Sequence, residues 1–408
     1  MNKVFICAAK RSPIGSFGGS LASLSPRQLG AEVLKSTLTM ALGKGSLVEG
    51  NTSALPVDEV IVGNVLAAGH GMNIARQVTL DAGLPVATPA FSINKVCGSG
   101  LKSVLLGAQA VALGDSEIVA AGGVESMSQA GFVNHEARFG KKMGSLQFVD
   151  LMLQDGLTDA FSCTHMGITA ENLARKFSIS REEQDRFAVH SQEKAVTAQK
   201  KGWLKSEIHP IPVPQRKGEA VLFSEDEFLR PETTVESLSR LRPAFEKDGT
   251  VTAGNSSGIN DGAAFVLLAS EAAIERYELK PLARIAAYAS AGVAPEVMGL
   301  GPVEAVRKVL KRTEKNLEEI DLIESNEAFA SQALAVNREL DWDVSKVNVA
   351  GGAIALGHPI GASGARILVT LLHQMQRVSA TSGIATLCVG GGQGVAVLVE
   401  RTPGRTAE

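Results

Sequence analysis

The chain repeats a set of short segments at a nearly constant separation. Each member of a pair has the same character: an acidic residue, an apolar run and an asparagine; a Ser-Gly step before a helical pattern; or a Gly-Gly step after an apolar run. The pairs are Glu59–Asn64 with Asp321–Asn326, Ser99-Gly100 with Ser363-Gly364, and Gly122-Gly123 with Gly390-Gly391. They lie 262, 264 and 268 residues apart. So long a period predicts a duplicated domain rather than a solenoid, although chance matches in a glycine-rich chain are the alternative.

Each predicted half alternates strands with helices. Apolar runs predict strands at 4–8, 118–121, 285–288 and 384–389, and helical spacing predicts helices at 29–42, 101–113, 303–310 and 365–375. Pro26 and Pro302 stand where the first helix of each half begins, a position that proline favours. Alternation of this kind predicts an α/β fold with mixed, largely parallel sheets covered by helices.

Composition excludes several classes of protein. The 408 residues are 45% hydrophobic and 20% charged, which indicates a globular chain of two or three domain-sized units. A net charge of −3 removes the electrostatic case for a nucleic-acid binder. We find no signal-peptide core and no continuous membrane-spanning run. These features predict a cytoplasmic protein with neither nucleic acid nor membrane as a partner.

The cysteines and histidines do not form a metal motif. The cysteines are at 7, 97, 163 and 388, without zinc-site spacing and too sparse for a disulfide scaffold. Each is by default a small buried residue. Five histidines, 70, 135, 190, 209 and 373, stand in contexts that predict surface positions. We therefore expect no metal site.

A region of different composition separates the two halves. Residues 128–257 contain Pro210, Pro212 and Pro214 together with several lysines and arginines. Helical patterns at 169–176 and 181–201 fall inside it, the second beginning after Ser180 as a predicted N-cap. We predict a first half at 1–127 completed by about 258–279, an inserted loop domain at 128–257, and a second half at 280–408.

Cys97 is the first candidate for chemistry. It lies in Asn94-Lys95-Val96-Cys97-Gly98-Ser99-Gly100, directly before a predicted helix. The N-terminus of a helix offers free N–H groups and partial positive charge, which lower the pKa of a thiol. This context is typical of a nucleophile, although a small residue packed in a tight turn explains it equally well.

Three further segments carry polar groups that suit acyl chemistry. His358 stands among the small residues of 351–364, where an imidazole is open to a cavity and can accept a proton. Cys388 precedes Gly390, Gly391 and Gly392, whose N–H groups can form an oxyanion hole. Asn326 ends an apolar run and can hold a water or a carbonyl oxygen. A structural role remains the alternative at each position.

These four segments resemble the thiolase family, and within it the biosynthetic acetyl-CoA C-acetyltransferases. The resemblance runs from Arg11-Ser12-Pro13-Ile14-Gly15 to the Cys388 loop. It implies that Cys97 is the acetylated nucleophile, that His358 activates it and shares an oxyanion hole with a water held by Asn326, and that Cys388 is the acid/base for the α-proton. It also implies a second oxyanion hole from the N–H groups of Cys97 and Gly390.

The resemblance further implies a coenzyme A site and an assembly. The residues that fall on the family's coenzyme A and acyl pocket positions are Leu157, His165, Met166, Arg230, Ser237, Phe245, Ala253, Ser257, Met298, Ala328 and Phe329. The implied fold is two βαβαβ halves in a layered αβαβα core. The implied substrates and products are acetyl-CoA, acetoacetyl-CoA and CoA, with no resident cofactor, and the implied assembly is a homotetramer or a dimer. The Gly- and Ser-rich stretch Gly43–Leu55 is longer than the family pattern.

Three alternatives stay open. The first is a degradative 3-ketoacyl-CoA thiolase with broader chain length, and the second is a non-catalytic acyl-CoA-binding homologue, against which the four motifs argue. The third is a thioester hydrolase. A ketoacyl synthase is disfavoured because the chain has no His-Gly-Thr-Gly-Thr segment.

Overall fold

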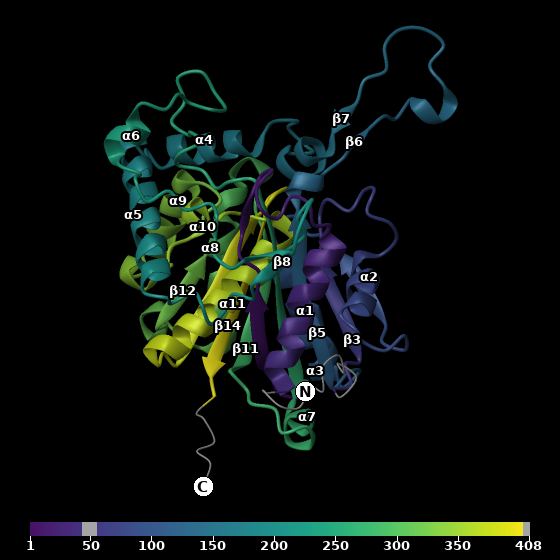
Figure 1. The fold of residues 1–408 in the computed structure, drawn as a ribbon. Coiled ribbons are helices and arrows are strands. Elements are labelled where there is room, and N and C mark those ends of the chain that lie inside the picture. Colours follow the sequence, from purple (N-terminus) through teal and green to yellow (C-terminus); the bar gives the residue numbers. More distant parts are fainter. Residues whose placement is uncertain (43–54, 403–408) are drawn as a thin grey trace.

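The computed structural model describes residues 1–42 and 55–402, and a mixed β-sheet runs through its centre (Figure 1). The strand order is β12-β13-β14-β11-β1-β10-β5-β3-β4, with β2 beside β10. The strands of the first half are β1 (Val4–Arg11), β2 (Gly15–Ser16), β3 (Glu59–Gly63), β4 (Ala90–Ile93), β5 (Ile118–Ser126) and β10 (Asn260–Ser270). Those of the second half are β11 (Ala283–Gly292), β12 (Leu322–Ser325), β13 (Ser382–Val389) and β14 (Gln393–Arg401). The stretch at 43–54 that departs from the family pattern lies outside the described residues.

Helices complete each half and form three layers around the sheet. The helices of the first half are α1 (Pro26–Leu42), α2 (Ile74–Asp81), α3 (Ser99–Leu113) and α7 (Glu271–Arg276). Those of the second half are α8 (Gly301–Thr313), α9 (Ala330–Leu340), α10 (Ala353–Leu356) and α11 (Ile360–Val378). Helices α1 and α2 cover the first half-sheet, α8 covers the second, and α3 and α11 pack between the two half-sheets. The layered, duplicated α/β fold is thereby confirmed.

The prediction of largely parallel sheets is wrong. Strand β3 is parallel to β4 and β5, and β12 is parallel to β13, but β1–β10, β10–β5, β11–β14 and β13–β14 are antiparallel. Parallel neighbours occur where a helix crosses between strands. Strand β14 instead follows β13 through a three-residue turn, and β10 returns from the insertion in the opposite direction.

The central helix α3 is as apolar as a membrane-spanning segment. Among the described residues, the window Val96–Leu113 alone reaches that length and hydropathy, and 56% of it is buried inside the fold. Leu101, Val104 and Leu105 lie in the core between the two half-sheets together with Leu368 of α11. A helix covered on both sides by a large fold must be apolar almost all round.

The two central helices approach each other so closely that side chains are excluded. A Cβ atom on Gly100 of α3 would lie 2.9 Å from the backbone nitrogen of Ala365, and one on Gly364 of α11 would lie 2.5 Å from the backbone nitrogen of Leu101. These glycines belong to the two copies of the repeated Ser-Gly step. The repeat therefore marks the point where the N-terminal ends of α3 and α11 meet.

Residues between the halves form a cap of short elements. Its helices are α4 (Met166–Lys176), α5 (Arg181–Lys200) and α6 (Val235–Ser239), and its strands are β6 (Phe132–Val133), β7 (Val149–Asp150), β8 (Ile211–Val213) and β9 (Val221–Phe223). Strands β6 and β7 lead into an arm that projects away from the body (Figure 1). After this region β10 joins β1 and β5 of the first half. The domain boundaries themselves stay a prediction.

Replacing Gly364 with alanine should destabilise the protein. Alanine is favoured over glycine in a helix by about 1 kcal/mol, but overpacking against an immobile backbone costs about 1–3 kcal/mol. We expect the clash with Leu101 to prevail, so that Gly364→Ala lowers the free energy of unfolding by up to about 2 kcal/mol in urea titration. Gly131→Ala is the control, since a Cβ there meets nothing within 4 Å. Equal stability of the two variants would contradict the tight crossing.

Candidate active site

A cavity of about 600 Å³ opens where the two halves meet the cap. All but two of the residues predicted for the site line it, and they come from both halves and the cap. The predicted residues in its lining are Cys97, Leu157, His165, Met166, Arg230, Phe245, Ala253, Ser257, Met298, Ala328, Phe329, His358, Cys388 and Gly390. The thiols of Cys97 and Cys388 and the imidazole of His358, which are far apart in the sequence, thus share one cavity.

The turn that carries Cys97 is tied down on both sides. The N–H of Val96 donates to Asn94 Oδ1 at 2.9 Å, while Ser99 Oγ accepts from the N–H of Lys95 at 2.8 Å and donates to the carbonyl of Val96 at 2.7 Å. Val96 has φ +46°, a strained conformation for a β-branched residue. These hydrogen bonds stabilise the strained backbone at Val96 and place Cys97 just before α3.

The prediction that the helix terminus lowers the pKa of Cys97 is wrong for this structure. Burial raises the pKa of the Cys97 thiol to about 11, although N–H groups of Gly390 and of Cys97 itself act in the opposite direction. The buried carboxylate of Glu125 raises it further. Desolvation exceeds the favourable effect of the backbone dipoles, so Cys97 rests as a neutral thiol.

His358 is buried and held in a single tautomer. Its Nδ1 lies 2.6 Å from Ser363 Oγ, and Ser363 Oγ donates its proton to the carbonyl of Pro359 at 2.9 Å. Ser363 must therefore accept from Nδ1–H, which leaves Nε2 as a proton acceptor. Burial, aided by the charge of Arg366, lowers the pKa of His358 to about 3. The imidazole is accordingly neutral, with its unprotonated Nε2 available as an acceptor but only weakly basic.

The loop after β13 brings the second sulfur and a backbone donor into the cavity. Cys388 is buried, and desolvation together with the nearby Cys97 thiol raises its pKa. Gly391 and Gly392 have φ +78° and +84°, and a Cβ on Gly392 would lie 2.3 Å from the carbonyl oxygen of Val293. The turn therefore requires glycine, and it points the N–H of Gly390 at the Cys97 sulfur.

Asn326 lies behind the cavity and not in its lining. Its backbone N–H donates to the carbonyl of Thr386 at 3.0 Å, and its side chain is completely buried. Among the described residues neither polar atom of that side chain has a hydrogen-bond partner. An unsatisfied buried amide is costly, so this side chain is suited to bonding a small polar molecule.

An aromatic and sulfur-containing wall narrows the cavity. The rings of His165 and Phe245 stack at 4.6 Å between centroids, and Phe245 meets Phe329 edge-on at 6.0 Å. His165 Nδ1 accepts from the N–H of Gly167 at 3.0 Å and so caps α4. Met298 and Cys388 belong to the same apolar cluster. These side chains bound the part of the cavity beside Cys388.

Ser237 is the second predicted residue that the cavity lining does not include, and its role in coenzyme A binding stays a prediction. This residue lies outside the cavity lining, where its hydroxyl caps α6 through bonds to the backbone N–H and carbonyl of Thr234 at 3.0 and 2.8 Å. Lining residues that sequence reasoning missed include Val96, Phe228, Leu229 and Ser256. Val96, Leu229 and Ser256 are each adjacent to a predicted residue and Phe228 lies two residues from Arg230, so closeness in the sequence is the available signal.

His373 is likewise not the surface residue predicted. Its ring lies in the core, with Nε2 3.0 Å from the carbonyl of Ala9 and Nδ1 3.1 Å from Ser206 Oγ. His373 is remote in sequence from both partners, so no local sequence pattern could predict its burial.

Comparison with known proteins agrees with this geometry. Residues 4–272 match the family Thiolase, N-terminal domain, and residues 279–401 match Thiolase, C-terminal domain. The chain is 57% identical to the acetyl-CoA acetyltransferase of Pseudomonas aeruginosa over 98% of this chain and 100% of that one. It is 55% identical to the acetyl-CoA acetyltransferase of Cupriavidus necator with the same coverage.

Solved structures share the whole fold. The acetyl-CoA acetyltransferase of Bacillus anthracis is 44% identical, with a TM-score of 0.93 over 98% of this chain and 99% of that one. Human mitochondrial 3-ketoacyl-CoA thiolase in complex with CoA is 44% identical, with a TM-score of 0.92 over 98% of each chain. The matched regions span both halves, the cap and every motif that meets in the cavity, and on this evidence the chain belongs to the thiolase family.

Proposed function

We propose that the protein is an acetyl-CoA C-acetyltransferase that joins two acetyl-CoA molecules reversibly to acetoacetyl-CoA and CoA through an acetyl-cysteine. The convergence of Cys97, His358 and Cys388 on one cavity carries the proposal. Full-length relatives named acetyl-CoA acetyltransferase support it. The proposed reaction uses two thioester substrates and the side chains of Cys97, His358 and Cys388. It requires no resident cofactor. A cytoplasmic location stays a prediction from the sequence.

In the first step, His358 Nε2 takes the proton of Cys97 as the sulfur attacks the thioester carbonyl. The resting pKa values of about 11 and about 3 make a Cys97 thiolate paired with a His358 imidazolium unfavourable in the free enzyme. Proton transfer therefore accompanies attack on bound substrate. Nε2–H then donates to the developing oxyanion, with a water held by Asn326 as the second donor. The C–S bond to CoA breaks, and the CoA sulfur leaves with the proton of Cys388.

In the second step, the Cys388 thiolate removes an α-proton from the second acetyl-CoA. The N–H groups of Cys97 and Gly390 stabilise the enolate oxygen that results. Its carbon attacks the acetyl group on Cys97, the C–S bond to Cys97 breaks, and Cys97 recovers its proton from His358. Every proton borrowed is returned, so the same residues serve cleavage in the opposite direction.

A degradative 3-ketoacyl-CoA thiolase is the second candidate, because a human enzyme of that name is a close structural neighbour. The wall formed by His165, Phe245 and Phe329 favours a short-chain acetyltransferase over a thiolase for long chains. Rates of CoA-dependent cleavage across 3-ketoacyl-CoA chain lengths decide between the two. Release of free acid in place of acyl-CoA would point instead to a hydrolase.

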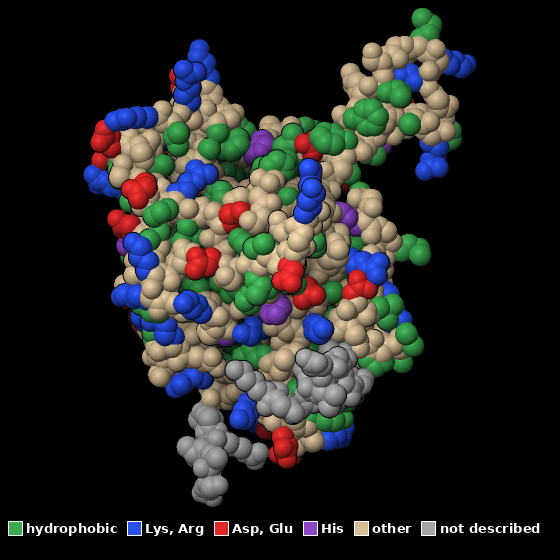
Figure 2. Space-filling view, in the orientation of Figure 1, with side chains coloured by type: hydrophobic (Ala, Val, Ile, Leu, Met, Phe, Trp, Pro, Cys, Tyr) green, Lys and Arg blue, Asp and Glu red, His purple; other side chains and the backbone are tan. Residues whose placement is uncertain are grey.

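We also propose that the chain assembles as a homo-oligomer, with a tetramer favoured and a dimer as the alternative. The arm, residues 131–150, exposes large apolar side chains well away from the body (Figure 2). Phe139 and Met143 are 91% and 86% exposed, and Phe132 and Phe148 are also open to solvent. Apolar groups gathered on one projection are typical of a contact surface.

Replacing the two cavity cysteines should give different defects. Cys97→Ser should abolish detectable thiolysis of acetoacetyl-CoA, because an alcohol is a far poorer nucleophile and leaving group. Cys388→Ala should still be acetylated at Cys97, as intact-protein mass spectrometry will show, but should turn over about 10²–10⁴-fold more slowly. Cys163→Ser, at an exposed cysteine, is the control and should keep full activity. Near-normal turnover by Cys97→Ser would rule out the nucleophile.

Alkylation of Cys97 in the free enzyme should be slow at neutral pH. With a thiol pKa of about 11, roughly one molecule in a thousand is thiolate at pH 8, and the fraction rises about tenfold per pH unit. Iodoacetamide labelling of the Cys97 peptide, followed by mass spectrometry, should therefore still be accelerating at pH 9.5, where a model thiol has levelled off. A midpoint near pH 7 would instead indicate a resting ion pair with His358.

Charged residues on the arm should reduce the assembly. We expect Phe139→Glu together with Met143→Glu to give a smaller particle in light scattering, because buried carboxylates are strongly disfavoured. Leu222→Glu, at an exposed apolar position of β9, is the matched control. A wild-type protein that is monomeric at micromolar concentration would refute the assembly, and an unchanged mass for the arm variant would remove the arm from it.

A further inference from the structure

Helix α5 of the cap has a buried polar face that contacts the cavity walls. Gln184, Asp185, Ser191 and Gln192 are all buried although each is polar. Gln192 Oε1 accepts from the N–H of Arg230 at 2.9 Å, and Ser191 Oγ donates to Glu327 Oε2 at 2.6 Å. A buried polar group costs stability unless it is bonded. This face therefore fixes the segments that it contacts.

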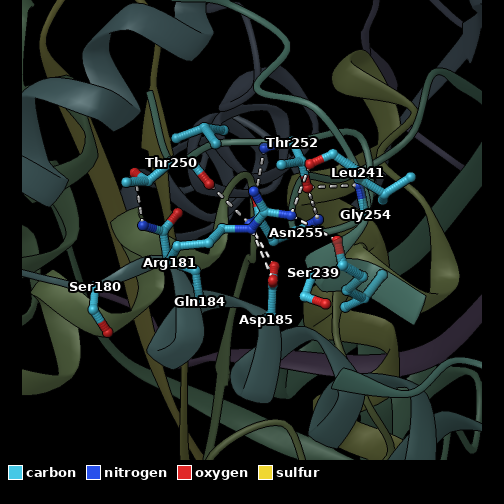
Figure 3. A network of polar contacts seen from close by, with 12 residues as sticks. Ser180, Arg181, Gln184, Asp185, Ser239, Leu241, Thr250, Thr252, Gly254 and Asn255 are labelled. Atoms are coloured by element: carbon cyan, nitrogen blue, oxygen red, sulfur yellow. Dashed lines mark hydrogen bonds and ion pairs between the residues drawn. The ribbon is translucent and has the colours of Figure 1, made fainter. Parts of the chain in front are cut away.

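Asp185 is the centre of the strongest of these contacts (Figure 3). Its Oδ2 accepts from Arg181 Nε at 2.7 Å, and its Oδ1 accepts from Asn255 Nδ2 at 2.9 Å. Asn255 Oδ1 in turn accepts from the N–H of Thr252 at 2.8 Å. The carboxylate thereby holds the loop 250–257, which contributes Ala253, Ser256 and Ser257 to the cavity.

Arg181 extends the same network to a second segment. Its Nη2 donates to the carbonyls of Leu238 and Leu241 at 2.6 and 3.0 Å, at the end of α6 (Figure 3). The side chains of these leucines pack directly under Gly254, where a Cβ would lie 2.5 Å from one and 2.6 Å from the other. The loop 250–257 is therefore fixed both by packing against these two leucines and by its hydrogen bond to Asp185.

The backbone of Asn255 carries the constraint into the second half of the molecule. Its carbonyl accepts from the N–H of Ala330 at 2.9 Å, and the N–H of Ser257 donates to the carbonyl of Ala328 at 3.0 Å. Ser256 and Phe329 form the antiparallel bridge between these bonds. Movement of the loop 250–257 would thus displace Ala328 and Phe329, which also line the cavity.

We propose that Asp185, which lines no part of the cavity, is a positioning residue for thioester binding: it fixes the loop 250–257, and through that loop the wall at 328–330. The inference rests on the proposed function for the identity of the thioester. An asparagine at this position has the same shape but only one acceptor oxygen. One of the two donors, Arg181 Nε–H or Asn255 Nδ2–H, then loses its acceptor and faces the new amide group, so the network holds the loop less firmly.

The test is the Asp185→Asn variant assayed for CoA-dependent cleavage of acetoacetyl-CoA. We expect KM for CoA to rise about tenfold, which corresponds to one lost buried contact, while kcat stays within about twofold. Acetylation stoichiometry at Cys97 should not change. Glu193→Gln makes the same chemical change at an exposed position of α5 and should match the wild type. Asp185→Asn with an unchanged KM, or with a fall confined to kcat, would overturn the inference.

A second variant keeps the test decisive if Asp185→Asn does not fold. Arg181 is partly exposed, so Arg181→Gln removes its bonds to Asp185 and to the two carbonyls with less risk to the core. We expect a smaller rise in KM, and in the double variant a rise no greater than for Asp185→Asn alone, because both changes break one network. Additive effects, or no effect of Arg181→Gln, would refute the coupling.

Calorimetric titration with CoA separates the two proposals. If the wild type binds CoA but does not cleave acetoacetyl-CoA, the proposed function fails and the Kd of the variants still tests Asp185. If the wild type is active and Asp185→Asn binds CoA as the wild type does, the positioning role fails and the function stands.

Discussion

The close approach of α3 and α11 at Gly100 and Gly364 is the constraint on which the rest of the structure depends. Because neither glycine has a Cβ, the two helices meet backbone to backbone at their N-terminal ends. Cys97 and His358 stand just before those ends. The same contact that closes the core between the two half-sheets therefore brings a sulfur and an imidazole into one cavity, although they are separated by more than half of the chain.

Burial at this junction gives the cavity its chemical character. Desolvation raises the pKa of both cavity cysteines and lowers that of His358, so the resting groups are all neutral. A neutral thiol is poorly reactive towards adventitious electrophiles. In the cavity, charge arises only when a thioester carbonyl can accept it, close to N–H groups already in place. Selectivity for thioesters over adventitious electrophiles thus follows, because forming charge in this cavity is costly when no thioester is bound.

Sequence patterns predicted what depends on short stretches of chain. The repeated Ser-Gly and Gly-Gly steps identified the duplication and the loops of Cys97, His358 and Cys388, because each is a local turn with its own residue requirements. Two features could not be predicted in this way. The pKa of Cys97 depends on burial by distant segments, and the antiparallel pairing of β10 depends on how the cap returns the chain to the first half.

Directional polar contacts add to the apolar packing that also holds the cap on the halves. Arg11 of β1 is fully buried and donates to both oxygens of Asp226 at 2.7 and 2.9 Å and to Glu207 at 2.5 Å, which ties the cap to the first half. Desolvating such charges offsets most of the attraction between them, so their contribution to stability is small. Their geometry is nevertheless demanding, since a bidentate pair tolerates little displacement. Asp185 and Arg181 act in the same way nearer the cavity. Their directional bonds add positional precision to the apolar packing of the cap, whereas the core between the half-sheets is held mainly by packing.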